Sequence, residues 1–436
     1  MMRLMDLRGQ QLTRRELSKL IPRHTADADA AHAAARDLVD DVQHRGLAAI
    51  LDHTQRFDQV EGHAVAVPRE HMVEALASLD GELRGALEST IARVREASAR
   101  QIPSGATTSF GDGAIVTQRW LPVERVGLYV PGGKAVYPSS VIMNVVPAQV
   151  AGVSSIALMS PPQPGAGGRI HPTILAAAEL LGVTEVYAIG GASAIGALAW
   201  GVAELNLDPV NVITGPGNRY VAAAKRYVRS RVGIDSEAGP TEILIIADDS
   251  ADARWVAADL ISQAEHDELA SSVLVSTSAE LVNDVSRELV AQATVTPHRE
   301  RVEQALRGSQ SALVIVDDLS TAVDFSNLYA PEHLEVQTEN PGVILPQLVN
   351  AGAIFVGNFS PVSLGDYSAG SNHVLPTGGH AAFSSGLGAY TFLRAQQVVE
   401  YSQNALREVS SGLEALATNE DLPAHGRAVS IRFDES

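Results

Sequence analysis

Two polar side chains that can bind a metal, Gln263 and His266, stand three residues apart in the segment ADLISQAEHDE. The composition of this segment is typical of a helix, in which residues three apart share one face. An amide oxygen and a neutral imidazole are both suitable zinc donors. A solvated histidine on a surface helix would have the same spacing, so the pattern leaves both interpretations open.

A second candidate is the adjacent pair Glu332 and His333 in YAPEHLEV, just before a segment typical of a strand. An acid and an imidazole at the end of a strand are well placed for proton transfer. Adjacent Glu–His pairs also occur by chance in many proteins. The pair therefore indicates acid–base chemistry only in combination with other polar groups.

Two further segments contain candidate ligands. Asp366 and His373 stand in SPVSLGDYSAGSNHVLPT, which we expect to be a long polar loop, and Glu420 and His425 stand in the C-terminal tail. Polar loops beside apolar strands often hold binding groups, although a loop or a frayed terminus needs no chemistry. Four residues of these segments and of the helical pair together form a nitrogen and oxygen donor set that suits zinc: Gln263, His266, Asp366 and His425.

Two glycine-rich turns, GGASAIGALAW (190–200) and GPGNRY (215–220), each follow a predicted strand and open a predicted helix. Backbone N–H groups at such a helix start can bind the phosphates of a dinucleotide. Neither turn has the GxGxxG fingerprint, and ordinary strand-to-helix turns also use glycine. In GLYVPGGKAVYPSS, Gly133 stands where a phosphate-binding P-loop requires lysine, so that motif is absent.

The elements that must position these residues alternate along the chain. Up to about residue 105 the sequence is typical of helices, mainly Asp27–His53 and Glu70–Gln101. Beyond it, helical segments such as Pro172–Leu181, Asn218–Ser230 and Asp252–Ala264 separate short apolar runs. We expect these runs to be strands: Val126–Val130, Ser155–Met159, Val186–Ile189, Val210–Ile213, Ile243–Ala247, Ser272–Val275, Ala312–Val316 and Ala353–Val356.

Strands buried on both faces and separated by helices predict parallel α/β layers. The alternation favours two such units, at 121–236 and 237–380, after a helical N-terminal region at 1–120. From 381 to 436 the alternation stops, and Tyr390–Leu416 is expected to be a helix that precedes a short tail. A tail of this kind has to pack on something, and a neighbouring subunit is one possibility.

Composition excludes several classes of function. The chain has 436 residues, 45% of them hydrophobic, and a net charge of −19, which disfavours nucleic acid and anionic membranes as partners. No segment approaches the roughly 18 uninterrupted apolar residues of a membrane span, so we expect a cytoplasmic protein. The chain contains no cysteine, which excludes disulfides, thiolate zinc sites and thiol catalysis.

Six motifs, in the order of the chain, carry a resemblance to a known family: VGLYVPGG, GPGN, AGPTE, SQAEH, PEHL and GDYSAGSNHVLPT. Together they resemble histidinol dehydrogenase, over nearly the whole chain from about residue 20 to the tail. The resemblance implies two incomplete Rossmann-like parallel-sheet units. It also implies that the helical N-terminal region contributes to the substrate and metal unit, that the first unit binds NAD, and that the C-terminal tail packs on the partner subunit of a homodimer.

The resemblance also implies roles for individual residues. Glu332 and His333 correspond to the proton-transfer pair of the family. The zinc ligands would be Gln263, His266, Asp366 and His425, the last supplied by the partner subunit. Substrate would be held by the same four ligands and by Thr241, His333 and Glu420, and Glu420 would also come from the partner. Cofactor would be contacted by Tyr129, Ser193 and Asn218.

Ser193 departs from the family, which usually has glutamine at this position. Serine keeps a hydroxyl but is shorter, so looser NAD binding or a bridging water is expected. The implied reaction is the zinc-dependent, four-electron oxidation of L-histidinol to L-histidine through the aldehyde with two NAD⁺, the last step of histidine biosynthesis. Without cysteine, the aldehyde cannot be held as a thiohemiacetal, so water must add to it. A zinc-dependent amidohydrolase and a non-catalytic nucleotide-binding scaffold are the alternatives.

Overall fold

The computed structural model describes residues 2–23, 28–132, 136–237 and 239–434. Gly133 of VGLYVPGG and Ala238 of AGPTE therefore lie outside the described residues. The chain divides into two compact units: unit 1 comprises Met1–Gln101 and Glu124–Phe392, and unit 2 comprises Ile102–Val123 and Leu393–Ser436. In the described parts of the chain, no helix has both the length and the apolar composition needed to cross a membrane.

The first sheet of unit 1 has six parallel strands. Their order across the sheet is β1 (Arg3–Asp6), β11 (Ala312–Ile315), β10 (Ser271–Ser276), β9 (Glu242–Ala247), β12 (His333–Gln337) and β13 (Ala353–Val356). On β9, Ile243 and Ile245 pack against helices on one face, whereas Leu244 and Ile246 pack on the other. This burial on both faces explains the uninterrupted apolar sequence of the strand.

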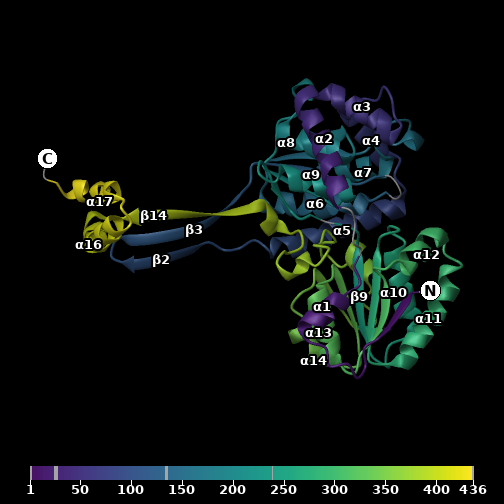
Figure 1. The fold of residues 1–436 in the computed structure, drawn as a ribbon. Coiled ribbons are helices and arrows are strands. Elements are labelled where there is room, and N and C mark those ends of the chain that lie inside the picture. Colours follow the sequence, from purple (N-terminus) through teal and green to yellow (C-terminus); the bar gives the residue numbers. More distant parts are fainter. Residues whose placement is uncertain (1, 24–27, 133–135, 238, 435–436) are drawn as a thin grey trace. The chain divides into compact units, whose positions relative to one another are not determined.

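Helices cover both faces of this sheet (Figure 1). One face is covered by α10 (Ala253–Ala264), α11 (Ala279–Ala293) and α12 (Arg299–Arg307). The other is covered by α1 (Arg14–Leu20), α13 (Leu319–Tyr329) and the short α14 (Pro341–Ile344). The prediction of parallel α/β layers is confirmed for this part of the chain.

The second sheet of unit 1 has five parallel strands. Their order is β6 (Glu185–Ala188), β5 (Ser155–Ser160), β4 (Arg125–Tyr129), β7 (Val212–Thr214) and β8 (Gly233–Ile234). One apolar cluster joins this sheet to α2 (Ala28–Arg45), α3 (Leu47–Asp58), α8 (Gly191–Trp200) and α9 (Arg219–Val228). Further helices pack in pairs, α5 (Gly81–Ala99) on α6 (Pro138–Ala151) and α4 (Arg69–Ala77) on α7 (Pro172–Leu180).

Two predictions about the N-terminal region need correction. The region begins with a strand, β1, which pairs in parallel with β11 and forms an edge of the six-stranded sheet. The expected helix Asp27–His53 is broken at Gly46, where φ is +55°. Residues with a side chain rarely adopt such a φ, so glycine allows the chain to turn there.

Unit 2 contains a three-stranded antiparallel sheet in the order β14 (Leu393–Tyr401), β3 (Ala114–Pro122) and β2 (Ala106–Gly111). Helices α16 (Gln403–Asn419) and α17 (Pro423–Ser430) follow β14 (Figure 1). The prediction of one helix over Tyr390–Leu416 is wrong, because Leu393–Tyr401 pairs with β3 along its whole length. Pairing with β3, a strand far earlier in the chain, determines that this segment is a strand. Local composition could not reveal that pairing.

Candidate active site

The Glu332–His333 pair lies where β12 begins beside β9, since His333 is the register partner of Ile243. Glu332 is buried and its Oε2 accepts hydrogen bonds from the Thr241 hydroxyl at 2.5 Å and from the Glu242 backbone N–H at 2.9 Å. Burial raises the pKa of the Glu332 carboxyl to about 8, against the opposing effect of these two donors. The carboxyl is thus held in place and made more basic than an ordinary glutamate.

His333 is buried in a fixed orientation. Its Nδ1 lies 3.0 Å from the backbone oxygen of Glu242, to which it donates. Because that contact uses the Nδ1–H, the neutral ring carries its lone pair on Nε2. Burial also lowers the pKa of His333, which favours this neutral form. The imidazole can therefore accept a proton at Nε2.

Gln263 lies in the last turn of α10, one-hundredth exposed, and donates through Nε2 to the Thr241 hydroxyl. Its Oε1 is buried and has no hydrogen-bond partner within the described residues. His266 was expected on the same helix, but α10 ends at Ala264. The turn nevertheless continues, because the His266 N–H donates to the Gln263 carbonyl at 3.3 Å. The ring of His266 donates through Nδ1 to the Ser262 carbonyl at 3.1 Å, which leaves Nε2 available.

Asp366 is on a short helix, α15 (Val362–Tyr367), where a loop was expected. Its charge raises the pKa of Glu332, which His266 opposes, so both side chains lie within electrostatic range of that carboxyl. The structure thus gathers Glu332, His333, Thr241 and three of the four proposed metal ligands in unit 1. Among the described residues, no group of three or more His, Asp or Glu side chains could by itself hold a metal.

Two acids that the sequence analysis missed, Asp259 and Glu335, connect the elements that carry the site. Gln337 Nε2 donates to Asp259 of α10 at 3.0 Å and to Glu335 of β12 at 2.9 Å. Glu335 also accepts from the Val362 N–H, the first residue of α15, at 2.9 Å. Burial raises the pKa of Glu335 well above its usual value. These contacts tie together the elements that carry Gln263, His333 and Asp366.

His373 also joins separate parts of unit 1. Its Nδ1 donates to the Asp366 carbonyl at 3.1 Å, and the Ser140 hydroxyl of α6 lies 3.1 Å from Nε2. The neighbouring Asn372 donates to the Met143 carbonyl of α6 at 2.7 Å. The segment after α15 is therefore fixed to the helix that follows β4. The sequence marked His373 only as an imidazole in a polar segment.

We expect the contribution of Glu332 and Glu242 to the stability of the metal-free protein to fall as the pH rises from about 5 to about 8. Burial raises the pKa of Glu332 to about 8 and that of Glu242 to about 7. The folded protein then keeps protons that the unfolded chain has already released, so the stabilisation is full below pH 4.5 and is lost through pH 7–8. Across this range the melting temperature of the unchanged protein should therefore fall relative to that of Glu332→Gln, which lacks the titrating carboxyl. Equal slopes for both proteins would contradict the assignment.

Each glycine-rich turn follows a strand and opens a helix, as the sequence predicted. Gly190 precedes α8, and Gly191 N–H donates to the hydroxyl of Tyr129 at 3.2 Å. Asn218 caps α9 by accepting from the N–H groups of Tyr220 and Val221. Since the cap uses its amide oxygen, contact with a ligand would fall to its amide nitrogen.

A buried ion pair holds the second turn. Asp235 accepts from the Gly215 N–H at 2.8 Å and pairs with Lys225, whose Nζ donates to the Gly215 carbonyl at 3.0 Å. Gly215 has φ +116°, and a Cβ there would lie 1.9 Å from the backbone oxygen of Tyr129. The turn therefore rests directly on the end of β4, in a position that only glycine can take.

Ser193 is engaged in a hydrogen-bonded chain inside unit 1. Its hydroxyl lies 2.8 Å from His53 Nδ1, and His53 Nε2 lies 3.0 Å from Asp41. Only 4% of Ser193 is exposed. With Nε2 donating to the carboxylate, Nδ1 accepts from the serine. The sequence contained no signal for this chain, because its members come from α2, α3 and α8.

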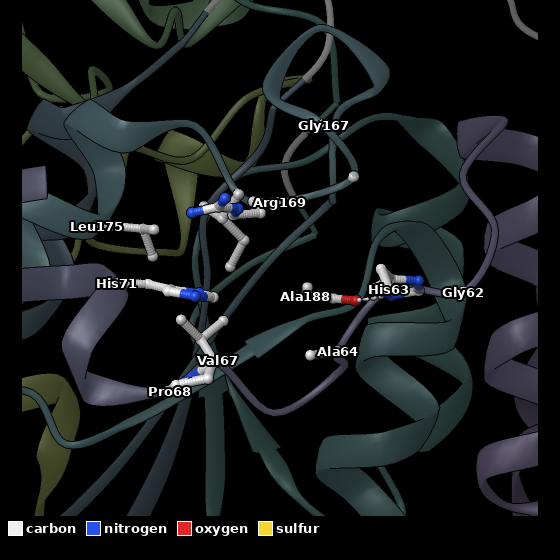
Figure 2. A pocket seen from close by; sticks show the side chains of 12 residues that line it. Gly62, His63, Ala64, Val67, Pro68, His71, Gly167, Arg169, Leu175 and Ala188 are labelled. Carbon is white, nitrogen blue, oxygen red and sulfur yellow. Dashed lines mark hydrogen bonds between the residues drawn. The ribbon is translucent and has the colours of Figure 1, made fainter. Parts of the chain in front are cut away.

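A cavity of about 200 Å³ is lined by the segment that follows α3 (residues 62–71), by residues 167–170 and 175, and by Ala188 (Figure 2). Arg169 and His71 reach into it, and His63 binds the backbone oxygen of Ala188 at 3.1 Å on another side. The remaining walls are mostly apolar and include Val67, Ile170 and Leu175. The cavity combines an apolar wall with a few polar groups, as ligand sites usually do.

Glu420 and His425 belong to unit 2, whereas the other candidate residues belong to unit 1. Glu420 ends α16 and His425 lies in α17, and both side chains are exposed. In the single chain, therefore, unit 1 holds Gln263, His266 and Asp366, whereas the fourth proposed ligand belongs to the other compact unit.

Comparison with protein families gives one match over most of the chain. The model of the histidinol dehydrogenase family matches residues 21–433. A histidinol dehydrogenase of Leifsonia xyli subsp. xyli is 62% identical over 434 residues, covering 100% of this chain and 100% of that relative. One of Mycobacterium tuberculosis is 57% identical over 432 residues, covering 98% and 97% of the two chains.

A solved structure agrees with these relatives. The histidinol dehydrogenase of Elizabethkingia anophelis superposes with a TM-score of 0.92 at 33% sequence identity. The superposition covers 99% of this chain and 98% of that one. The similarity thus extends over both units as well as over the motifs.

Proposed function

This chain belongs to the histidinol dehydrogenase family, and on that premise we propose that it oxidises L-histidinol to L-histidine through the aldehyde, with reduction of two NAD⁺. As a member of the family it is an oxidoreductase of histidine biosynthesis. The amidohydrolase and scaffold alternatives have no support from these relatives. The observation that carries the mechanism is the buried Glu332–His333 pair beside Gln263, whose amide oxygen has no partner among the described residues.

We propose that Gln263, His266, Asp366 and the His425 of a partner subunit bind zinc. The donors fit this metal, because a buried amide oxygen without a partner and an imidazole with a free Nε2 are both suited to it. A bound zinc ion would serve as a template that orients the amine and imidazole of the substrate. Glu420, also from the partner, and Thr241 would hold the substrate from other sides.

The proposed cofactor contacts are Tyr129, Ser193 and Asn218. Their turns fit a dinucleotide, since Gly190 precedes α8 and Asn218 caps α9, and the backbone N–H groups at such helix starts can bind phosphates. Bound NAD⁺ would take up a hydride in each of the two oxidations. Because Ser193 already bonds His53, its hydroxyl would contribute less to this binding than the glutamine usual in the family.

His333 is the proposed general base of both oxidations. Its Nε2 would take the hydroxyl proton of the alcohol in the first oxidation and that of the hydrated aldehyde in the second. The Nδ1 bond to the Glu242 carbonyl keeps the ring oriented throughout. Because the ring is buried and neutral, it can accept a proton without first losing one.

Glu332 is the proposed base that activates water between the two oxidations. The Thr241 hydroxyl and the Glu242 N–H hold one carboxyl oxygen. A pKa of about 8 makes this carboxylate a better proton acceptor than an ordinary glutamate. With no cysteine in the chain, hydration is the route by which the aldehyde becomes oxidisable again.

We propose a homodimer in which unit 2 reaches the partner. Exposed apolar side chains on its strand and helices, such as Val399, Leu416 and Ile431, support an interface there. The cytoplasm is the proposed location, because the substrate and the dinucleotide are small soluble metabolites.

The test of this function is the amount of NADH formed per L-histidinol consumed, with limiting substrate and excess NAD⁺. We expect two NADH, lost with a chelator and restored by Zn²⁺. One NADH would mean that the aldehyde escapes and that Glu332 does not activate water. None, with zinc restored, would contradict the proposed reaction.

A further inference from the structure

Asp58, the last residue of α3, has a half-buried carboxylate that no described residue pairs with. None of the hydrogen bonds and ion pairs found among the described residues involves it, and burial raises its pKa to about 6. Its two oxygens lie 3.1 and 3.3 Å from where a Cβ of Gly190 would be. A carboxylate partly removed from water without a donor is unfavourable unless a ligand provides one.

Asp58 lies where dinucleotide-binding sheets usually have an acid that this sheet lacks. In dinucleotide-binding parallel sheets, an acid at the end of the second strand binds the adenosine ribose. Here the second strand is β5, next to β4 on the side away from β7. It ends at Ser160, and the following residues, Pro161, Pro162 and Gln163, include no acid. The side chain of Pro161 would meet the same Cβ of Gly190 at 2.8 Å, so Asp58 stands beside that strand end.

Tyr129 and the cavity of Figure 2 both lie near this carboxylate, which places it within the proposed cofactor region. Burial raises the pKa of the Tyr129 hydroxyl, and Asp58 lies close enough to raise it further. Tyr129 in turn accepts a hydrogen bond from the Gly191 N–H. The cavity of Figure 2 adjoins the same two segments: its lining includes Gly62, four residues after Asp58, and Ala188, two residues before Gly190.

We propose that Asp58 accepts hydrogen bonds from the hydroxyls of the adenosine ribose and thereby selects NAD over NADP. This inference rests on the proposed use of NAD. Ribose hydroxyls supply the donors that the carboxylate lacks among the described side chains and backbone groups. The 2′-phosphate of NADP would instead bring a second negative charge to a partly desolvated carboxylate, which is unfavourable.

The test is the binding of NADH and of NADPH to the full-length protein, followed by the fluorescence of the reduced nicotinamide. We expect NADPH to bind the unchanged protein more weakly than NADH. In Asp58→Asn, the Kd for NADH should rise roughly tenfold and that for NADPH should fall roughly tenfold, the size expected for hydrogen bonds to a charged group. Asp58→Ser, which is shorter, should shift the ratio in the same direction.

Asp52→Asn is the matched control, because Asp52 is on the same helix but is exposed and paired with Arg45 at 2.7 Å. It removes the same charge and should leave the NADH to NADPH ratio within about threefold, as expected for a surface charge. If the unchanged protein binds NADH and the Asp58 variants melt normally but keep its preference, the inference is wrong while the proposed function stands. Binding of neither dinucleotide would overturn the use of NAD and this inference with it.

Discussion

Replacement of His333 by alanine should lower the turnover of histidinol by roughly 10²- to 10⁴-fold, the usual contribution of a positioned general base. The loss is expected because no other described imidazole has its Nδ1 bonded to the Glu242 carbonyl and its Nε2 free at this strand end. Both half-reactions should slow together, since the same nitrogen would take the proton in each. The measurement is the rate of NADH formation with histidinol and, separately, with the aldehyde.

His333→Asn separates the two roles of the ring. An asparagine amide can still donate to the Glu242 carbonyl, as Nδ1 does, but it has no basic nitrogen in place of Nε2. This variant should therefore keep its zinc content and melting temperature closer to the unchanged protein than His333→Ala does, while turnover stays low. Near-normal turnover in either variant would exclude His333 as the base.

Glu332→Gln should slow oxidation of the aldehyde by about 10²-fold or more, and oxidation of the alcohol much less. The amide can still accept from the Thr241 hydroxyl and the Glu242 N–H, so the local geometry survives while the base is lost. Histidinol should then give one rapid NADH, with the aldehyde accumulating. Rates for the two substrates, measured separately by NADH formation, check this outcome.

The matched control is Glu242→Gln, the same change at a neighbouring buried carboxyl that faces Arg23 at 3.5 Å. Its backbone, which binds Glu332 and His333, is unaffected by the substitution. We expect this variant to lower both half-reactions alike if it lowers them at all. Equal losses in the two half-reactions for Glu332→Gln would mean that this residue does not activate water.

Local patterns predicted the parallel layers well. Central strands of unit 1 such as β9 and β11 are short, apolar and buried, and helices begin at recognisable residues such as Asn218, which caps the start of α9. Local patterns gave the wrong element where pairing with a distant strand determines the secondary structure. Leu393–Tyr401 is a strand because β3 lies beside it, and Arg3–Asp6 is a strand because β11 does.

Fewer features of the candidate site than of the fold could be predicted from the sequence. Spacing marked Glu332–His333 and Gln263–His266 as candidates, but their roles came from the resemblance to a family. Partners drawn from separate elements could not be found this way, since no local signal connects Asp41, His53 and Ser193, or Asp259 and Glu335. The closeness of Asp58 to Gly190 and Pro161, which motivates its proposed role, likewise exists only once α3 and β5 are folded.

The pairing of β3 with β14 also determines when unit 2 can be completed. Strand β3 is synthesised early, whereas β14 and the two helices after it form the last part of the chain. Until that part leaves the ribosome, β3 has an unpaired edge on the β14 side, and such edges recruit strands of other chains. A message truncated before β14 would thus yield a chain that has unit 1 and a β2–β3 hairpin with an unpaired edge. We expect this chain to aggregate during expression rather than accumulate as a monomer.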